Sequence, residues 1–363
     1  MRRRSRGCAR RDGPRAMTPD WRSLVDLQAL ARWMASQGLG EGPIVGARAL
    51  TGGTQNILLA FERDGVPMVL RRPPAHAHAD SDVVIRRETQ ILTALRGAAT
   101  PHPRLIAACA DPAVLGASFY VMEAVAGFTP HAGLPAPFDS DPALRRRMGL
   151  SLVDCIADLG QLDYAALGLG EFGKPNGFLE RQVGRWRRQL DSYVRYAAWP
   201  GPAALGDIDG LGAWLDRHRP PHQSPGIIHG DVHLANVLYR FDAPEVAALV
   251  DWELATIGDP LVDLGWLLAH WPAADGTGIA TTGAQPWTGF PSADELVARY
   301  AETSGRKVGD VHWYACLACY KRAVVIEGTY ARALAGLADM ETGRDLHARA
   351  AGLIDRAYRF AAR

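Results

Sequence analysis

The chain has 363 residues, of which 48% are hydrophobic, and its formal net charge is +1. This length and composition are typical of a globular protein with one large or two modest domains. The near-neutral charge gives no reason to expect a nucleic-acid or membrane partner. No run approaches the roughly 18 apolar residues of a membrane-spanning helix, and no apolar signal segment follows the basic start. We therefore expect a cytoplasmic protein, whose sequence gives no indication of its oligomeric state.

Residues 1–16 differ in composition from the rest of the chain. They are rich in arginine, contain Gly and Pro, and have no apolar periodicity. Such a segment is expected to be a disordered basic extension, with Met17 as the natural start. The alternative is a transit peptide or a nucleic-acid-binding arm, but this segment has no amphipathic pattern that would support it.

Residues 17–126 are predicted to form an N-terminal lobe with a leading helix. Apolar residues recur at helical spacing in residues 19–37 and again in residues 82–95. Short apolar runs bounded by turns predict strands at residues 44–50, 57–61, 66–71, 105–109 and 118–125. A small sheet with few helices is therefore expected in this part of the chain.

The turn between the first two predicted strands reads Thr51-Gly52-Gly53-Thr54. Glycine admits unusual dihedral angles and close approach of the backbone, so the amides of such a turn can face a phosphate group. We assign Gly52, Gly53 and Thr54 to nucleotide binding, although a Gly-Gly pair is more often a simple turn.

Residues 127–363 are predicted to form a C-terminal lobe. A stretch rich in Pro, Gly and Ala leads into segments of helical periodicity at residues 141–159, 177–196, 207–218, 259–271, 292–303, 311–334 and 340–361. The helix at 177–196 carries several arginines. A basic face of this kind is usually solvated, and the functional alternative is a site for an anionic acceptor.

The most informative stretch lies at residues 226–253. A short apolar strand ends at the polar corner His229-Gly230-Asp231, and Asn236 follows Asp231 by five positions. Residues 237–239 and 246–250 then resemble a buried hairpin that ends at Asp251. Two carboxylates and an amide are therefore expected to converge at one end of this hairpin.

These residue types suit phosphoryl transfer. One carboxylate accepts or orients the proton of the acceptor hydroxyl, and hard oxygen ligands hold the Mg²⁺ that neutralises the phosphates. We predict that Asp231 performs the first task and that Asn236 and Asp251 perform the second. The alternative is that all three residues are ordinary turn and cap residues.

The spacing H-x-D-x-x-x-x-N, followed by an aspartate after the hairpin, resembles the catalytic loop of the aminoglycoside phosphotransferase and choline kinase type of small-molecule kinase. Residues 251–264, DWELATIGDPLVDL, resemble the branch that also occurs fused to acyl-CoA dehydrogenases. The resemblance covers about residues 44–360. It implies an α+β, two-lobed protein kinase-like fold with a small antiparallel-sheet N-lobe and a mainly helical C-lobe. Residues 17–126 would then be the nucleotide-binding lobe, and residues 127–363 the catalytic and acceptor-binding lobe.

The resemblance also implies roles for residues outside the hairpin. ATP would be the phosphoryl donor, with Mg²⁺, and a small-molecule hydroxyl would be the acceptor, either an aminoglycoside-like antibiotic or a hydroxyacyl-type metabolite. Within the catalytic loop, His229 accompanies Asp231, and Asp263 braces both. Arg71 stands where kinases have a phosphate-binding lysine, and Glu88 is its expected partner. Two alternatives remain open: Arg72 fills this role instead, or Glu88 lies on the surface. The adenine would bind backbone groups near Glu123 and Val125.

Two other function classes fit parts of the sequence. A nucleotide-binding pseudokinase is suggested only by Arg71 in the lysine position. A two-metal phosphoesterase could use His229, Asp231 and His233 as ligands. That class needs further ligands, typically in a Gly-Asn-His turn, which does not occur in this chain.

Overall fold

The computed structural model describes residues 21–50, 56–74, 81–272 and 284–363. The described residues form two compact units, the first made of those up to Ile85 with Ile106–Glu123, the second of Arg86–Leu105 with Ala124–Arg363. The chain passes finally from one unit to the other between Glu123 and Ala124. The predicted extension 1–16 lies outside the described residues, and the predicted domain limits stay a prediction.

The first unit is built on a five-stranded sheet, in which the order of the strands in space differs from their order in the chain. Its strands follow the spatial order β1 (Ile44–Ala49), β2 (Ile57–Arg63), β3 (Val66–Arg72), β5 (Phe119–Glu123) and β4 (Leu105–Cys109). β1 pairs with β2, β2 with β3, and β3 with β5, all antiparallel. All five predicted strands are confirmed, with ends displaced by at most two residues.

The leading helix is shorter than predicted. In place of one helix over 19–37, a 3₁₀ turn (Trp21–Ser23) precedes α1 (Leu27–Ser36). Asp26 is the N-cap of α1, because its carboxylate accepts hydrogen bonds from the backbone N–H groups of Gln28, at 2.8 Å, and Ala29, at 3.1 Å. α1 and α3 (Pro112–Leu115) pack on the sheet, and Leu30 and Met34 enter its core.

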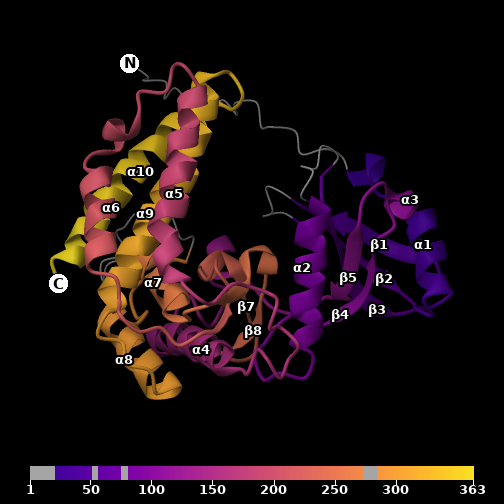
Figure 1. The fold of residues 1–363 in the computed structure, drawn as a ribbon. Helices are drawn as coiled ribbons and strands as arrows, with labels where there is room; N and C mark the ends of the chain where they lie inside the picture. The colour runs from indigo at the N-terminus through magenta and orange to yellow at the C-terminus, as the bar shows by residue number, and fades with distance from the viewer. Residues whose placement is uncertain (1–20, 51–55, 75–80, 273–283) are drawn as a thin grey trace, which may run out of the picture. The chain divides into compact units, whose positions relative to one another are not determined.

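The second unit is mainly helical (Figure 1). Its helices are the later part of α2 (Ser81–Ala94), α4 (Pro142–Gln161), α5 (Gln182–Asp191), α6 (Ile208–Arg217), α7 (Leu261–His270), α8 (Ala293–Ser304), α9 (Val311–Leu334) and α10 (Met340–Ala361). α9 packs against α10, α7 and α5. The prediction at 177–196 was only partly right, because 3₁₀ turns at Leu179–Arg181 and Ser192–Arg195 flank α5.

Two small antiparallel sheets lie within this helical unit. β7 (Val237–Tyr239) pairs with β8 (Val246–Leu249), which confirms the predicted hairpin. β6 (Gly226–Ile228) pairs with β9 (Thr256–Gly258), a three-residue strand that the sequence did not predict. Within the described ranges, no helix has the length and apolar character that crossing a membrane requires.

Candidate active site

The polar loop between β6 and β7 begins with a sharp corner at Gly230. This residue has a φ of +89°, and a Cβ at its position would lie 2.6 Å from the carbonyl oxygen of Leu254. Only glycine fits both the dihedral angle and the close approach. The corner turns the chain directly after β6, and Asp231 follows it.

Asp263 fixes this corner from α7. Its Oδ2 accepts a hydrogen bond from the backbone N–H of His229 at 2.7 Å, and its Oδ1 accepts one from that of Gly230 at 2.8 Å. The side chain is 1% exposed, and burial raises the pKa of this carboxyl to about 7 although both bonds favour the ionised form. Asp263 therefore holds the loop in the way that the sequence resemblance implied, while its effect on catalysis stays a prediction.

His229 has both ring nitrogens engaged with the protein. Its Nδ1 accepts from the N–H of Asp231 at 3.3 Å, so Nε2 carries the proton and donates to the carbonyl oxygen of Val250 at 3.1 Å. The ring lies 4.6 Å from that of Trp252, and burial lowers its pKa to about 4. A neutral ring held in this way cannot also bind a metal. This contradicts the use of His229 as a ligand in a two-metal phosphoesterase, and it also makes His229 a positioning residue.

The buried ring of His229 should make stability depend on pH. The unfolded chain protonates this histidine near its usual pKa of 6.5, whereas the folded protein protonates it only near pH 4. The neutral ring of His229 therefore makes its full contribution to the free energy of unfolding above pH 6.5. As the pH falls toward 4, this contribution is lost, by about 3 kcal/mol. The pH dependence of unfolding free energy should flatten in His229→Asn but not in the exposed control His131→Asn. An NMR titration that finds an ordinary pKa for the His229 ring would contradict this.

Asp231 is the carboxylate at the tip of the loop. Its Oδ1 accepts from the indole Nε1 of Trp266 at 3.0 Å, and its Oδ2 accepts from Nδ2 of Asn236 at 2.9 Å. His233 Nε2 lies 3.5 Å from Oδ1. Burial alone would raise the pKa of Asp231, but the hydrogen bond and charge of His233 and the charge of Lys321 lower it below its usual range. The result is an ionised carboxylate with fixed orientation, whose side chain is 24% exposed.

The β7–β8 ladder brings Asn236 and Asp251 together. Val237 pairs with Leu249, and the N–H of Val250 donates to the carbonyl oxygen of Asn236 at 3.0 Å, so the next residue is Asp251. Asp251 adopts a left-handed conformation with φ of +69°, which is strained for a residue with a side chain and is common at functional sites. The hairpin thus places Asn236 and Asp251 at the same end, where Asn236 contacts Asp231, while the roles predicted for the three residues stay predictions.

The family of the chain follows from comparison with known proteins. A model of the phosphotransferase enzyme family, APH, matches residues 46–296, which is more than half of the chain and includes the whole loop and hairpin. The chain belongs to this phosphotransferase family.

The most similar relatives support the predicted branch. The chain is 30% identical over 310 residues to acyl-CoA dehydrogenase family member 11 from Gallus gallus, covering 82% of this chain and 38% of the relative. It is 28% identical over 311 residues to the probable acyl-CoA dehydrogenase IBR3 from Arabidopsis thaliana, covering 81% and 37%. The chain thus spans 38% or less of the length of these relatives.

Solved structures confirm the fold. A protein from Ralstonia eutropha assigned as an aminoglycoside phosphotransferase has a TM-score of 0.76 and 28% identity, with coverage of 93% of this chain and 98% of that one. A mutant of aminoglycoside phosphotransferase APH(4)-Ia, in a ternary complex with ADP and hygromycin B, has a TM-score of 0.56 and 16% identity, covering 92% and 98%. The predicted α+β fold, with an antiparallel-sheet N-terminal part and a helical C-terminal part, is confirmed.

The nucleotide-binding candidates of the phosphotransferase are distributed over both units. Gly52, Gly53 and Thr54 lie outside the described residues. Arg71 and Arg72 are buried on β3, and Arg72 donates to the carbonyl oxygen of Leu24 at 2.6 Å. Successive residues of a strand point to opposite faces, so Arg71 points away from this contact.

The other candidates are placed as follows. Glu88 on α2 is fully buried, which excludes the alternative that it lies on the surface. Glu88 belongs to the second unit, whereas Arg71 belongs to the first. Glu123 ends β5, and Val125 follows the unit boundary. The pairing of Arg71 with Glu88 and the adenine contacts near Glu123 and Val125 stay predictions.

Sequence reasoning missed three residues that surround Asp231. Trp266 lies one helical turn after Asp263, so this spacing on α7 could have revealed it. His270, one turn further, is buried, and its ring lies 4.6 Å from that of Trp266 and 5.4 Å from that of His233. Lys321 on α9 donates to the carbonyl oxygen of Gly230 at 3.1 Å. In the sequence, Lys321 stands out only as a cation inside an apolar helix.

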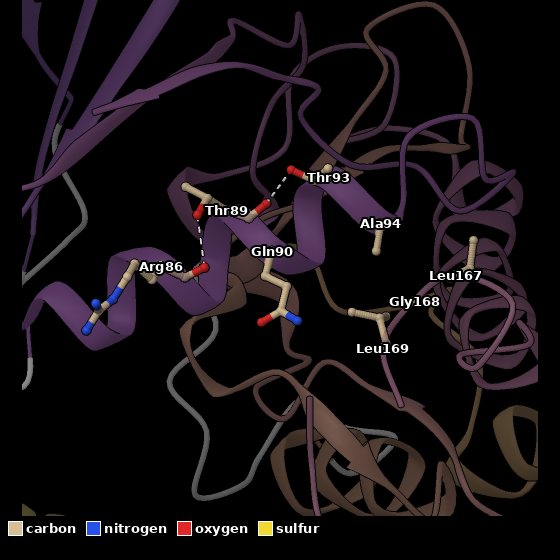
Figure 2. Close-up of a pocket in the computed structure, with 8 residues that line it drawn as sticks. All are labelled: Arg86, Thr89, Gln90, Thr93, Ala94, Leu167, Gly168 and Leu169. Atoms are coloured by element: carbon tan, nitrogen blue, oxygen red, sulfur yellow. Dashed lines mark hydrogen bonds between the residues drawn. The ribbon is translucent and has the colours of Figure 1, made fainter. Parts of the chain in front are cut away.

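A shallow pocket in the second unit lies apart from these residues (Figure 2). It is lined by Arg86, Thr89, Gln90, Thr93 and Ala94 of α2 and by residues 167–169. The hydroxyl of Thr89 donates to the carbonyl oxygen of Arg86, and that of Thr93 to that of Thr89. These polar groups are satisfied within the helix, so the pocket gives no indication of a ligand.

Proposed function

We propose that this phosphotransferase moves the γ-phosphoryl group of ATP to a hydroxyl group of a small molecule. The observation that carries the proposal is the convergence of an ionised Asp231 with Asn236 and Asp251 at the end of one hairpin. ADP in the APH(4)-Ia complex and AMP-PNP in another complex of that protein support the use of an adenine nucleotide.

Asp231 would receive the proton of the acceptor hydroxyl. Oδ1 accepts from Trp266 and lies 3.5 Å from His233 Nε2, whereas Oδ2 accepts from Asn236 and retains lone-pair capacity for the acceptor hydroxyl. Because these donors are fixed, the carboxylate does not need to reorient when the hydroxyl arrives. Phosphoryl transfer depends mainly on positioning of this kind.

Asn236 and Asp251 would hold Mg²⁺. Asn236 donates its Nδ2 to both the carbonyl oxygen and Oδ2 of Asp231, which directs its amide oxygen away from that carboxylate. Two hard oxygens without a histidine fit magnesium better than zinc. When bound with ATP, the ion would neutralise phosphate charge. In the part of the chain that the structure describes, no three His, Cys, Asp or Glu side chains are grouped to hold a metal by themselves.

Arg71 would bind the phosphates of ATP. Arg71→Ala should therefore weaken ATP binding about tenfold or more, the size of a lost charge-assisted hydrogen bond. Arg72→Ala is the matched control, because its side chain is committed to Leu24 and its loss should reduce stability rather than affinity. Calorimetric titration with ATP compares the two. Equal or reversed changes in affinity would show that Arg72 fills the role.

Cationic residues near Asp231 favour an acidic acceptor. Lys321 and Arg322 of α9 both interact electrostatically with Asp231, and Arg185 of α5 acts on Lys321. Arg187 of the same helix is engaged elsewhere, since it pairs with Asp191 and Asp209. A polycationic aminoglycoside would be repelled by this group, whereas a hydroxyacyl-type metabolite with a carboxylate or phosphate would be attracted.

ADP release in the presence of hydroxylated acids, hydroxyacyl thioesters and aminoglycosides tests this choice. We expect turnover with an acidic acceptor, and a KM for it that rises about tenfold or more in Arg322→Gln. Arg188→Gln, an exposed change on α5, is the control and should leave that KM unchanged. Turnover with aminoglycosides alone would contradict an acidic acceptor. ATP binding without any turnover would favour the pseudokinase that Arg71 suggests.

A further inference from the structure

Lys321 is a cation within a largely buried stretch of α9. Its neighbours Tyr320, Ala323 and Val324 are 1% exposed or less. Lysine is rarely placed in such a position unless its ammonium group has partners, because removal of a charge from water is costly. The residue therefore needs a reason beyond packing of the helix.

The partners of Lys321 are a carbonyl group and two indole rings. Its Nζ donates to the carbonyl oxygen of Gly230 at 3.1 Å and lies 4.0 Å from the centroid of the Trp266 ring. The Trp186 ring, on α5, lies 5.7 Å away. Indole faces attract cations, so these contacts compensate part of the lost hydration.

Both close contacts lead to Asp231. Gly230 immediately precedes it in the chain, and the indole N–H of Trp266 donates to its Oδ1 at 3.0 Å. The N–H of Gly230 is bound by the carboxylate of Asp263 and its carbonyl oxygen by the ammonium group of Lys321. Side chains from α7 and α9 thus fix the two polar groups of the residue that sets the direction of Asp231.

We infer that Lys321 is a positioning residue of the transfer reaction, which holds the Gly230 peptide and the Trp266 indole so that Asp231 keeps one orientation. The inference rests on the proposed function for its catalytic consequence. The anchoring itself is a structural property that can be tested without an acceptor.

The charge of Lys321 gives the inference a pH signature. Burial lowers its pKa to about 8, against the charges of Asp231 and Asp263, while Arg185 lowers it further. As the pH rises through about 8, the ammonium group becomes a neutral amine, a weaker donor to Gly230 and no longer attracted by the ring. Turnover should therefore decline on the alkaline side.

Three variants separate positioning from general stability. Lys321→Met keeps the side-chain length without charge, Lys321→Arg keeps a charge that does not titrate in this range, and Lys307→Met changes an exposed lysine. We expect Lys321→Met to lower kcat about tenfold to a hundredfold with little change in the KM for ATP, as misplacement of a catalytic group does. Lys321→Arg should retain more activity than Lys321→Met, and its turnover should not decline at alkaline pH. Lys307→Met should behave as wild type.

Hydrogen exchange, followed by mass spectrometry on peptides covering residues 226–236, gives the readout that needs no acceptor. Exchange in this loop should increase in Lys321→Met and stay near wild type in Lys321→Arg and Lys307→Met. Unchanged exchange in Lys321→Met would overturn the inference, as would an unchanged kcat and pH profile. A wild-type protein that transfers no phosphoryl group, but whose loop loosens in Lys321→Met, would refute the proposed function and leave the anchoring role intact.

Discussion

Asp231→Asn should lower turnover by a factor on the order of 100 or more while folding and ATP binding persist, as loss of a positioned proton acceptor commonly does. The amide can still accept from Trp266 at one oxygen, so the loop keeps this contact. It can no longer take a proton from the acceptor hydroxyl at neutral pH. Steady-state kinetics and ATP calorimetry on the same preparation measure the two effects separately.

Asp242→Asn is a control for the loss of one carboxylate, because Asp242 is exposed and forms a surface ion pair with Arg240 at 2.8 Å. It should leave kcat and ATP affinity unchanged. If Asp231→Asn turned over at nearly the wild-type rate, Asp231 would not be the proton acceptor, and its hydrogen bonds to Trp266 and Asn236 would be structural.

Asp263→Asn should reduce both stability and turnover. An asparagine can accept only one of the two hydrogen bonds from His229 and Gly230, and its amide N–H₂ would face the other donor. A buried donor left without its acceptor costs about 1–3 kcal/mol. Because the corner before Asp231 would then shift, we expect kcat to fall on the order of a hundredfold. Denaturant unfolding and kinetics measure the two consequences.

Asp259→Asn is the matched control for a buried carboxylate. Asp259 is 3% exposed and accepts from the N–H of Leu261 at 3.0 Å and the hydroxyl of Tyr314 at 2.9 Å, outside the catalytic loop. Its loss should cost comparable stability and leave kcat of the folded protein unchanged. Equal losses of kcat in both variants would mean that Asp263 acts only through overall stability.

The sequence could predict the hairpin half of the site because its geometry is local. Asn236 and Asp251 flank two short apolar strands joined by residues 240–245, and the register of such a hairpin places its ends together. The long helices α9 and α10 were also predictable, since apolar periodicity persists over many turns.

Contacts between distant segments were not predictable in the same way. Lys321 reaches Gly230 from 91 positions along the chain, and no spacing rule connects them. The role of His229 stayed open as well, because only the structure shows that Val250 and Asp231 occupy both ring nitrogens. The leading helix was overextended because its periodicity continues through Asp26, whose capping bonds begin a new helix.

Transfer of a label from γ-labelled ATP tests the central claim most directly. With magnesium and an acidic hydroxylated acceptor, the account predicts that the label appears in an organic phosphate monoester, in a one-to-one ratio with ADP, and that Asp231→Asn suppresses it. Label found only as inorganic phosphate, at a rate independent of every acceptor tried, would contradict a phosphotransferase acting on a small-molecule hydroxyl.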